Sequence, residues 1–252
     1  MTEGRNNNQI LKKGGALLFW LLIWQLGASA ANRSLLLPIP TPVDTAAALL
    51  RFLGQADFYL TVASSLGRIC AGFVLAFITG TLCAFLAARY EWFHILTSPL
   101  LQLIRAIPVA SFTILVFLWV SRGKIPGTIS FLTVFPIIWA NVENGLRNAD
   151  RRLSEMAAVF GMGKADILRQ VTLPSLRPYF STAAATGLGF AWKSGVAAEV
   201  ICRTGNSLGD MLWASKSAVC YDEVFALTAV IVLCSTALEA LARRLLKEAR
   251  RD

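Results

Sequence analysis

Six long apolar runs constrain the fold of this chain more than any other feature of its sequence. A membrane-spanning α-helix needs about 20 consecutive, mostly apolar residues, and 56% of the 252 residues are hydrophobic. The runs do not alternate with period two, which argues against a transmembrane β-barrel. We therefore expect an all-α membrane protein with one domain over residues 1–252 and six transmembrane helices, at about residues 14–31, 65–88, 99–121, 125–145, 178–202 and 224–241.

The charges predict how these spans are oriented. The chain contains 24 Lys and Arg residues and 15 Asp and Glu residues, a net charge of +9. Most of the basic residues fall in the segments that lie on one side of the membrane if the N-terminus is cytoplasmic. Positive residues favour the inside, so we place both termini and residues 146–178 in the cytoplasm. Membrane orientation accounts for the basicity, and we expect no nucleic-acid partner.

The first span allows a second interpretation. Lys12 and Lys13 precede an apolar run that ends in GASAA, as in a cleavable signal peptide with its site at Ala28–Ala30. The length of the run and its two tryptophans favour a retained span.

The cysteines and the single histidine predict no metal site. The five cysteines lack metal-ligand spacing. Cys202 and Cys220 bracket a predicted outer loop, so a disulfide between them is conceivable. His94 lies beside Trp92 in a short inner loop and is expected to be a surface residue.

Two further patterns predict local structure. Residues 38–53 begin as a proline-rich turn, after which Thr41 or Asp44 can cap a short outer helix over residues 45–53. Two of the spans carry small residues at every fourth position, which predicts close packing against other helices. These residues are Gly72, Ala76, Gly80, Ala84 and Ala88 in the second span, and Ala183, Gly187, Ala191 and Gly195 in the fifth.

The stretch EMAAVFGMGKADILRQVTLP, residues 155–174, is too polar to span a membrane. Its apolar residues share one helical face, whereas its charges lie largely elsewhere. Gly161 and Gly163 predict two short helices that meet at a bend. Pro174 cannot continue an ordinary helix, and Pro178 suits the start of the next span. Such an amphipathic segment can lie on the lipid surface, pack under its own bundle, or dock in a groove of a soluble partner.

The spacing of this stretch resembles the cytoplasmic signature of ABC-importer permeases: E-A-A, three residues, G, nine residues, I-x-L-P. The residues that match in register are Glu155, Ala157, Gly161, Leu173 and Pro174. Met156 and Val171 depart from the signature but keep its apolar character. The segments LLLPIPTPVDTAAALL, SLGRICAGF, RAIPVASF and AWKSGVAAEVI resemble the nitrate, sulfonate and taurine branch of these permeases. After Pro108 that branch often has a further proline, where this chain has FTILVFLW.

The resemblance implies a type I importer permease fold in the inner membrane of a prokaryote. Residues 150–175 would form a cytoplasmic coupling helix between spans four and five that docks in a cleft of a separate ATPase. The implied partners are two ATPase subunits, an extracytoplasmic substrate-binding protein and a second, identical permease. ATP and magnesium would bind to the ATPase. The GMGKAD stretch is no P-loop, since it lacks the earlier glycine and has Ala165 in place of Ser or Thr.

Charges inside spans are functional candidates, because burying them in a membrane is costly. Arg68 and Glu199 are predicted near the outer ends of their spans, where they can approach each other or the pathway mouth, or extend to the interface. Lys193 lies deeper and suits a pathway for an anion, or can pair with Glu143 or a carbonyl group. Arg105, in the RAIP segment, either lines the pathway or extends to the inner interface.

The sequence therefore predicts a permease without an active site that imports a small anionic or sulfonate-like solute by alternating access. An ion- or proton-driven transporter that uses Glu199 and Lys193 as relay groups is the alternative, and it would need no ATPase. A membrane enzyme is disfavoured, because no cluster of His, Cys or carboxylates is present. The chain does not contain the binding protein that selects the solute.

Overall fold

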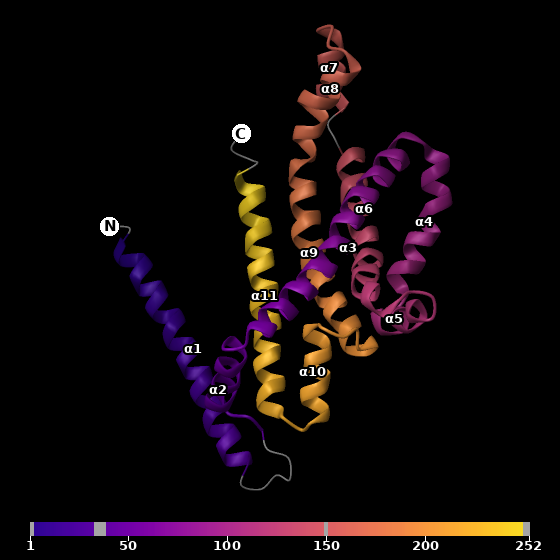
Figure 1. The fold of residues 1–252 in the computed structure, drawn as a ribbon. Helices are drawn as coiled ribbons and strands as arrows, with labels where there is room; N and C mark the ends of the chain where they lie inside the picture. The colour runs from indigo at the N-terminus through magenta and orange to yellow at the C-terminus, as the bar shows by residue number, and fades with distance from the viewer. Residues whose placement is uncertain (1–2, 33–38, 149–150, 249–252) are drawn as a thin grey trace. The chain divides into compact units, whose positions relative to one another are not determined.

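The computed structural model describes residues 3–32, 39–148 and 151–248, and in these residues it contains helices and no strands (Figure 1). The chain groups into two compact units. Unit 1 comprises Met1–Leu60 and Met211–Ile231, and unit 2 comprises Thr61–Asp210 and Val232–Asp252. The expectation of a single membrane domain stays a prediction.

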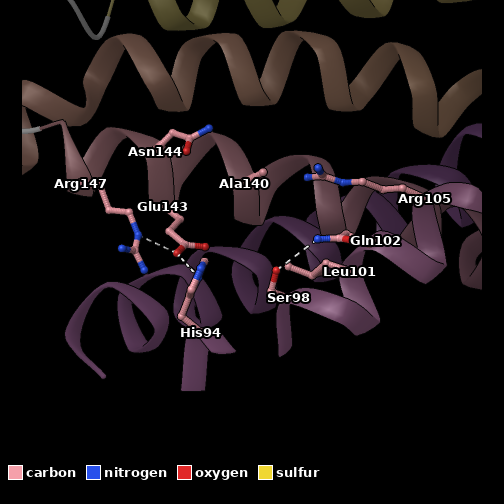
Figure 2. Close-up of a pocket in the computed structure, with 9 residues that line it drawn as sticks. All are labelled: His94, Ser98, Leu101, Gln102, Arg105, Ala140, Glu143, Asn144 and Arg147. Atoms are coloured by element: carbon pink, nitrogen blue, oxygen red, sulfur yellow. Dashed lines mark hydrogen bonds and ion pairs between the residues drawn. The ribbon is translucent and has the colours of Figure 1, made fainter. Parts of the chain in front are cut away.

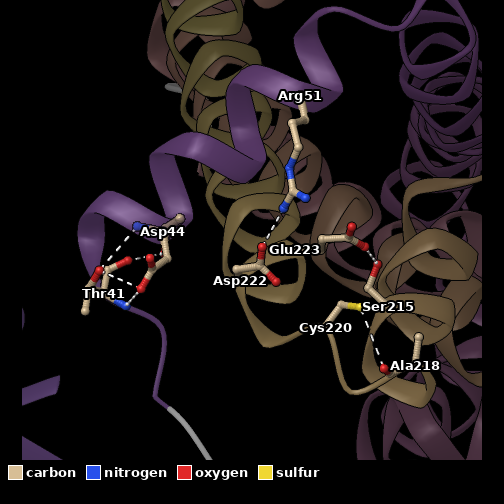
Figure 3. A network of polar contacts seen from close by, with 9 residues as sticks. Thr41, Asp44, Arg51, Ser215, Ala218, Cys220, Asp222 and Glu223 are labelled. Atoms are coloured by element: carbon tan, nitrogen blue, oxygen red, sulfur yellow. Dashed lines mark hydrogen bonds and ion pairs between the residues drawn. The ribbon is translucent and has the colours of Figure 1, made fainter. Parts of the chain in front are cut away.

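In unit 1, helix α1 (Glu3–Ala31) is followed by the short helix α2 (Pro42–Leu53). Trp24 Nε1 in α1 donates to the Pro40 carbonyl oxygen at 3.1 Å. Thr41 is the N-cap of α2: its Oγ1 accepts from Asp44 N, and the Asp44 carboxylate accepts from Thr41 N (Figure 3). This capping box confirms the expected short helix and uses both predicted capping residues, although the helix begins three residues earlier than expected.

The Asp44 carboxylate is stabilised in its charged form. Hydrogen bonds from the side chain and then the backbone of Thr41 hold the pKa of Asp44 below its usual value. The same unit contains an exposed ion pair between Arg51 and Asp222, 2.5 Å apart (Figure 3). All five cysteines are free in the structure. Cys202 and Cys220 belong to different units, so a disulfide between them stays a prediction.

Helices α10 (Leu208–Ser217) and α11 (Tyr221–Glu248) end the chain, and each is shared between the units. Ser215 Oγ donates to Glu223 Oε2 at 2.8 Å and so ties the two helices across their turn (Figure 3). Val219 in this turn has a positive φ of 64°.

In unit 2, α6 (Ile125–Arg147) packs against α9 (Leu173–Cys202), and α3 (Ala56–Arg89) approaches both helices closely. All the predicted small residues except the exposed Ala88 are buried. A Cβ at Gly72 would overlap the Gly127 carbonyl of α6, and one at Gly195 would lie 2.7 Å from Ser130 Oγ. Because these positions lack side chains, the helix backbones approach closely, as the spacing predicted.

Within the part of the chain that the structure describes, four helical segments are long and apolar enough to cross a membrane: Gly14–Ala31, Ala56–Arg89, Arg122–Arg147 and Tyr221–Arg244. They correspond to four of the six predicted spans. The predicted span 178–202 lies on α9, which is long enough but is not in this set because its composition is less apolar. Its buried residues include Ser194 and Glu199 as well as several glycines.

The predicted continuous span 99–121 is wrong. Two helices occupy this region, α4 (Glu91–Ala106) and α5 (Val109–Phe117), and they bend by 101° at the break between them. Pro108 lacks an N–H group and restricts Ile107 to an extended conformation, with φ −75° and ψ 125°. Together the two helices are a candidate for one broken span or for a re-entrant loop. A one-turn 3-10 helix, η1 (Arg122–Lys124), precedes α6.

Candidate functional site

The predicted coupling segment folds as two short helices at one end of α9 (Figure 1). Helix α7 (Arg151–Val159) ends at Gly161, which has a φ of +81°. The Met162 N–H donates to the Ala157 carbonyl at 3.1 Å, which is the closing hydrogen bond of a glycine-terminated helix. Gly161 is therefore required at this position, and the predicted bend is confirmed.

The second short helix continues directly into α9. Helix α8 (Lys164–Ile167) is followed by one π-helical turn, η2 (Leu168–Thr172), and α9 begins at Leu173. A proline ring needs room at the carbonyl four residues earlier, so the wider π turn accommodates Pro174. The expected break at Pro174 is therefore wrong, and Pro178 lies inside α9 rather than at its start. As a result, α8 is joined to the bundle without an intervening loop.

The segment exposes apolar side chains at its tip. Val159 is 86% exposed, Phe160 79% and Met156 54%. Glu155, Leu173 and Pro174 are also exposed, whereas Ala157 is buried. Of the three environments predicted for the segment, packing under its own bundle is therefore excluded for these three apolar side chains. We call Met156, Val159 and Phe160 the apolar tip.

Glu199 is fully buried at the C-terminal end of α9 and binds the start of α10. Its Oε2 accepts from Ser65 Oγ at 2.9 Å and from Gly209 N at 3.2 Å. Ser65 Oγ in turn accepts from Leu208 N at 2.9 Å. A carboxylate is favourable beside the N-terminal amides of a helix. We call Glu199, Ser65 and the Leu208 and Gly209 amides the α10 anchor.

Arg68 lies beside this anchor, but no ion pair joins it to Glu199 in the described part of the chain. Its guanidinium donates to the carbonyls of Gly205 and Asn206, at 3.3 and 3.5 Å. These two residues have positive φ angles of 65° and 47°. Arg68 and Glu199 are thus brought to the same loop, where each holds a different part of its backbone.

Lys193 is exposed on α9. It has neither of the partners proposed for it: among the described residues it forms no ion pair with Glu143 and no hydrogen bond to a carbonyl. Glu143 instead binds three other donors.

Those donors form a cluster between α4 and α6 (Figure 2). His94 Nδ1 and Arg147 Nε lie 2.6 and 2.9 Å from Glu143 Oε1, and Trp139 Nε1 lies 2.9 Å from Glu143 Oε2. His94 is partly exposed, as expected of a surface residue, but it lies in α4 rather than in a loop, and its side chain binds Glu143. The i,i+4 spacing of Trp139, Glu143 and Arg147 is the sequence signal that predicts part of this cluster.

Arg105 lies further along the same pair of helices, and its guanidinium donates to the Pro136 carbonyl at 2.5 Å. A cavity of about 350 Å³ runs between α4 and α6 from His94 to Arg105. We call it the α4–α6 cleft. Among the described residues, no group of three or more His, Cys, Asp or Glu side chains is arranged to hold a metal ion.

Residues 72–251 match the family model of the binding-protein-dependent transport system inner membrane component. The chain belongs to this family. The permease is 29% identical to the bicarbonate transport system permease protein CmpB of Synechococcus elongatus, over 81% of this chain and 76% of the relative. It is 26% identical to the taurine transport system permease protein TauC of Escherichia coli, over 95% of this chain and 90% of the relative.

Solved structures show the same fold. The permease aligns with a chain of an amino acid ABC transporter crystallised with histidines at a TM-score of 0.61 and 14% identity, covering 83% of this chain and 95% of that one. It aligns with a chain of an inward-facing MetNI methionine ABC transporter at a TM-score of 0.59 and 17% identity, covering 75% of this chain and 93% of that one. The permease therefore has the type I ABC importer fold and is a membrane permease subunit of an ABC importer. The ion-driven alternative is not supported.

Proposed function

We propose that this permease imports a small anionic or sulfonate-like solute and receives its energy from a separate ATPase bound at residues 150–175. The observation that carries the proposal is the apolar tip. Three exposed apolar side chains end a segment whose second helix continues into α9. An apolar surface of this kind favours burial in a groove of a soluble protein over contact with water.

The proposed mechanism is mechanical. ATP-driven closure of the ATPase would move the coupling segment, and the continuous α8–η2–α9 rod would transmit the movement to the bundle. Within the rod, Leu173 and Pro174 lie where the π turn passes into α9. Glu155, exposed on α7, would pair with a basic residue of the ATPase. The permease itself would bind no cofactor, and ATP and Mg²⁺ would be held by the ATPase.

Lys193 supports an anionic solute. A cation exposed within a membrane helix is costly in lipid, and the described residues offer it no counter-ion. That cost is avoided if this side of α9 faces a water-filled path, where Lys193 would attract an anion. The names of the relatives, which concern bicarbonate and taurine, agree with a small polar solute of this kind.

We infer a complex of two identical permeases, two ATPase subunits and an extracytoplasmic binding protein. One permease would supply half of a two-fold pathway, and the binding protein would select the solute. Both chain termini and the coupling segment would lie in the cytoplasm, because the basic residues concentrate there.

The experiment targets the apolar tip. Val159→Asp combined with Phe160→Asp should abolish copurification of a co-expressed ATPase subunit from the same organism, since two charges would have to be buried in the docking groove. Val219→Asp is the matched control, because Val219 is also an exposed apolar residue but lies in the α10–α11 turn. Equal recovery of the ATPase with the double variant and with wild type would refute the docking site.

A further inference from the structure

The α4–α6 cleft has the size and lining of a ligand site, and the coupling segment makes no use of it. Its volume of about 350 Å³ lies within the range of roughly 300–1,000 Å³ that is typical of small-molecule sites. Polar side chains from both helices line it along most of its length, as Figure 2 shows.

The acid that lines the cleft is already neutralised. Glu143 is buried, and both of its carboxylate oxygens are occupied: His94 and Arg147 bind Oε1, and Trp139 binds Oε2. A cation entering the cleft would therefore have to displace one of these donors. This makes Glu143 a support for the cluster rather than a site for a positive ligand.

The remaining lining offers hydrogen-bond donors in excess. Arg147 uses Nε on Glu143, and within the described residues its two terminal nitrogens have no acceptor. Arg105 uses one terminal nitrogen on the Pro136 carbonyl. Gln102 donates to Ser98 at 3.5 Å, the outer limit of a hydrogen bond, and the exposed Asn144 also lines the cavity. Two guanidinium groups and two amides thus face the cavity, with a single neutralised acid between them.

We propose that the α4–α6 cleft binds a small oxyanionic group, such as a sulfonate, sulfate, carboxylate or phosphate. Guanidinium groups suit such ligands, because their planar N–H donors match pairs of anionic oxygens. The binding follows from the donors of the cleft alone. The interpretation of the cleft as a binding site for the imported solute rests on the proposed function. A lipid phosphate could supply the same chemistry, so the experiment separates the two sources.

The probes are methanesulfonate and inorganic sulfate, titrated calorimetrically into the purified full-length permease in nanodiscs of zwitterionic lipid. Gln102→Glu places a carboxylate in the cleft at an exposed position, so folding should survive, and it should weaken anion binding at least tenfold. Asn144→Asp should act in the same way from the opposite helix. Gln55→Glu is the matched control, because Gln55 is exposed in the α2–α3 turn, outside the cleft.

A second arm uses nanodiscs that contain phosphatidylglycerol, with bound lipid counted by native mass spectrometry. Retention of this lipid by wild type and by Gln55→Glu, with loss in Gln102→Glu, would also establish the oxyanion site and identify a lipid headgroup as its occupant. The proposal is overturned if neither free anion nor lipid binds, or if all variants bind equally. Since no ATPase is present, failure of the coupling proposal would leave this result unaffected.

Discussion

The α10 anchor and the apolar tip lie at opposite ends of the α8–η2–α9 rod, and they are built in opposite ways. At the anchor, buried Glu199 binds Ser65 and the first amides of α10, so the polar groups are largely paired within the chain. At the tip, the side chains of Val159 and Phe160 are largely exposed. Most polar atoms of the anchor are paired within the chain, although Glu199 Oε1 is buried without a hydrogen-bond partner among the described residues. At the tip, apolar surface is left uncovered where we propose a partner.

The difference teaches how to separate a structural charge from a functional one. Glu199 was a candidate pathway residue because it is an acid in a span, but its contacts give it the role of a helix cap. Lys193, six residues earlier on the same helix, is exposed and has no such contacts in the described chain. Of these two residues, Lys193 therefore remains the better candidate for the pathway.

The largest loss of stability is expected when the anchor is broken. Glu199→Leu should destabilise the permease by about 3 kcal/mol, because it leaves the Ser65 hydroxyl and the Gly209 amide buried without their acceptor. The measurement is thermal unfolding in detergent, with Glu199→Gln as the isosteric control. An unchanged melting temperature in Glu199→Leu would show that the anchor does not stabilise the C-terminal end of α9, and the contrast with the tip would disappear.

A smaller effect is expected at the tip. Gly161→Val forces a β-branched residue into a left-handed conformation, at a cost of about 1–2 kcal/mol. The strain is confined to the end of α7, so recovery of the copurified ATPase should fall while the melting temperature of the bundle changes little. Gly54→Ala is the control, since Gly54 has a negative φ and room for a Cβ. A large drop in melting temperature would show that the tip supports the bundle itself.

The smallest effect concerns the exposed capping box of α2. Thr41→Ala should cost about 1 kcal/mol, a typical value for loss of an N-cap. Because the folded pKa of Asp44 is lowered, its contribution is present at neutral pH and is lost as pH falls through that lowered pKa. The difference in melting temperature between wild type and Thr41→Ala should therefore shrink only below about pH 4. A constant difference down to pH 2 would contradict a role for the Asp44 charge.

Several features of the site could be read directly from residue patterns. The bend at Gly161 follows from a glycine set in an amphipathic helical pattern, and the buried stripes in α3 and α9 follow from small residues four apart. The bend between α4 and α5 was missed, although Pro108 is a local signal, because the apolar run continues through it and composition alone suggested one span. The continuity of α8 with α9 was missed because a proline such as Pro174 ordinarily ends a helix. A π turn tolerates this proline where an α-helix would not.

The sequence by itself determined which segments are helical, where the polar segment 155–174 lies, and to which family the chain belongs, because these properties depend on residues close together in the chain. The tertiary structure alone decided which charges pair. Glu143 meets His94, and Glu199 meets Ser65, across separations of 49 and 134 residues. Such partners are selected by the packing of helices whose backbones approach through glycine, and no local pattern records that approach.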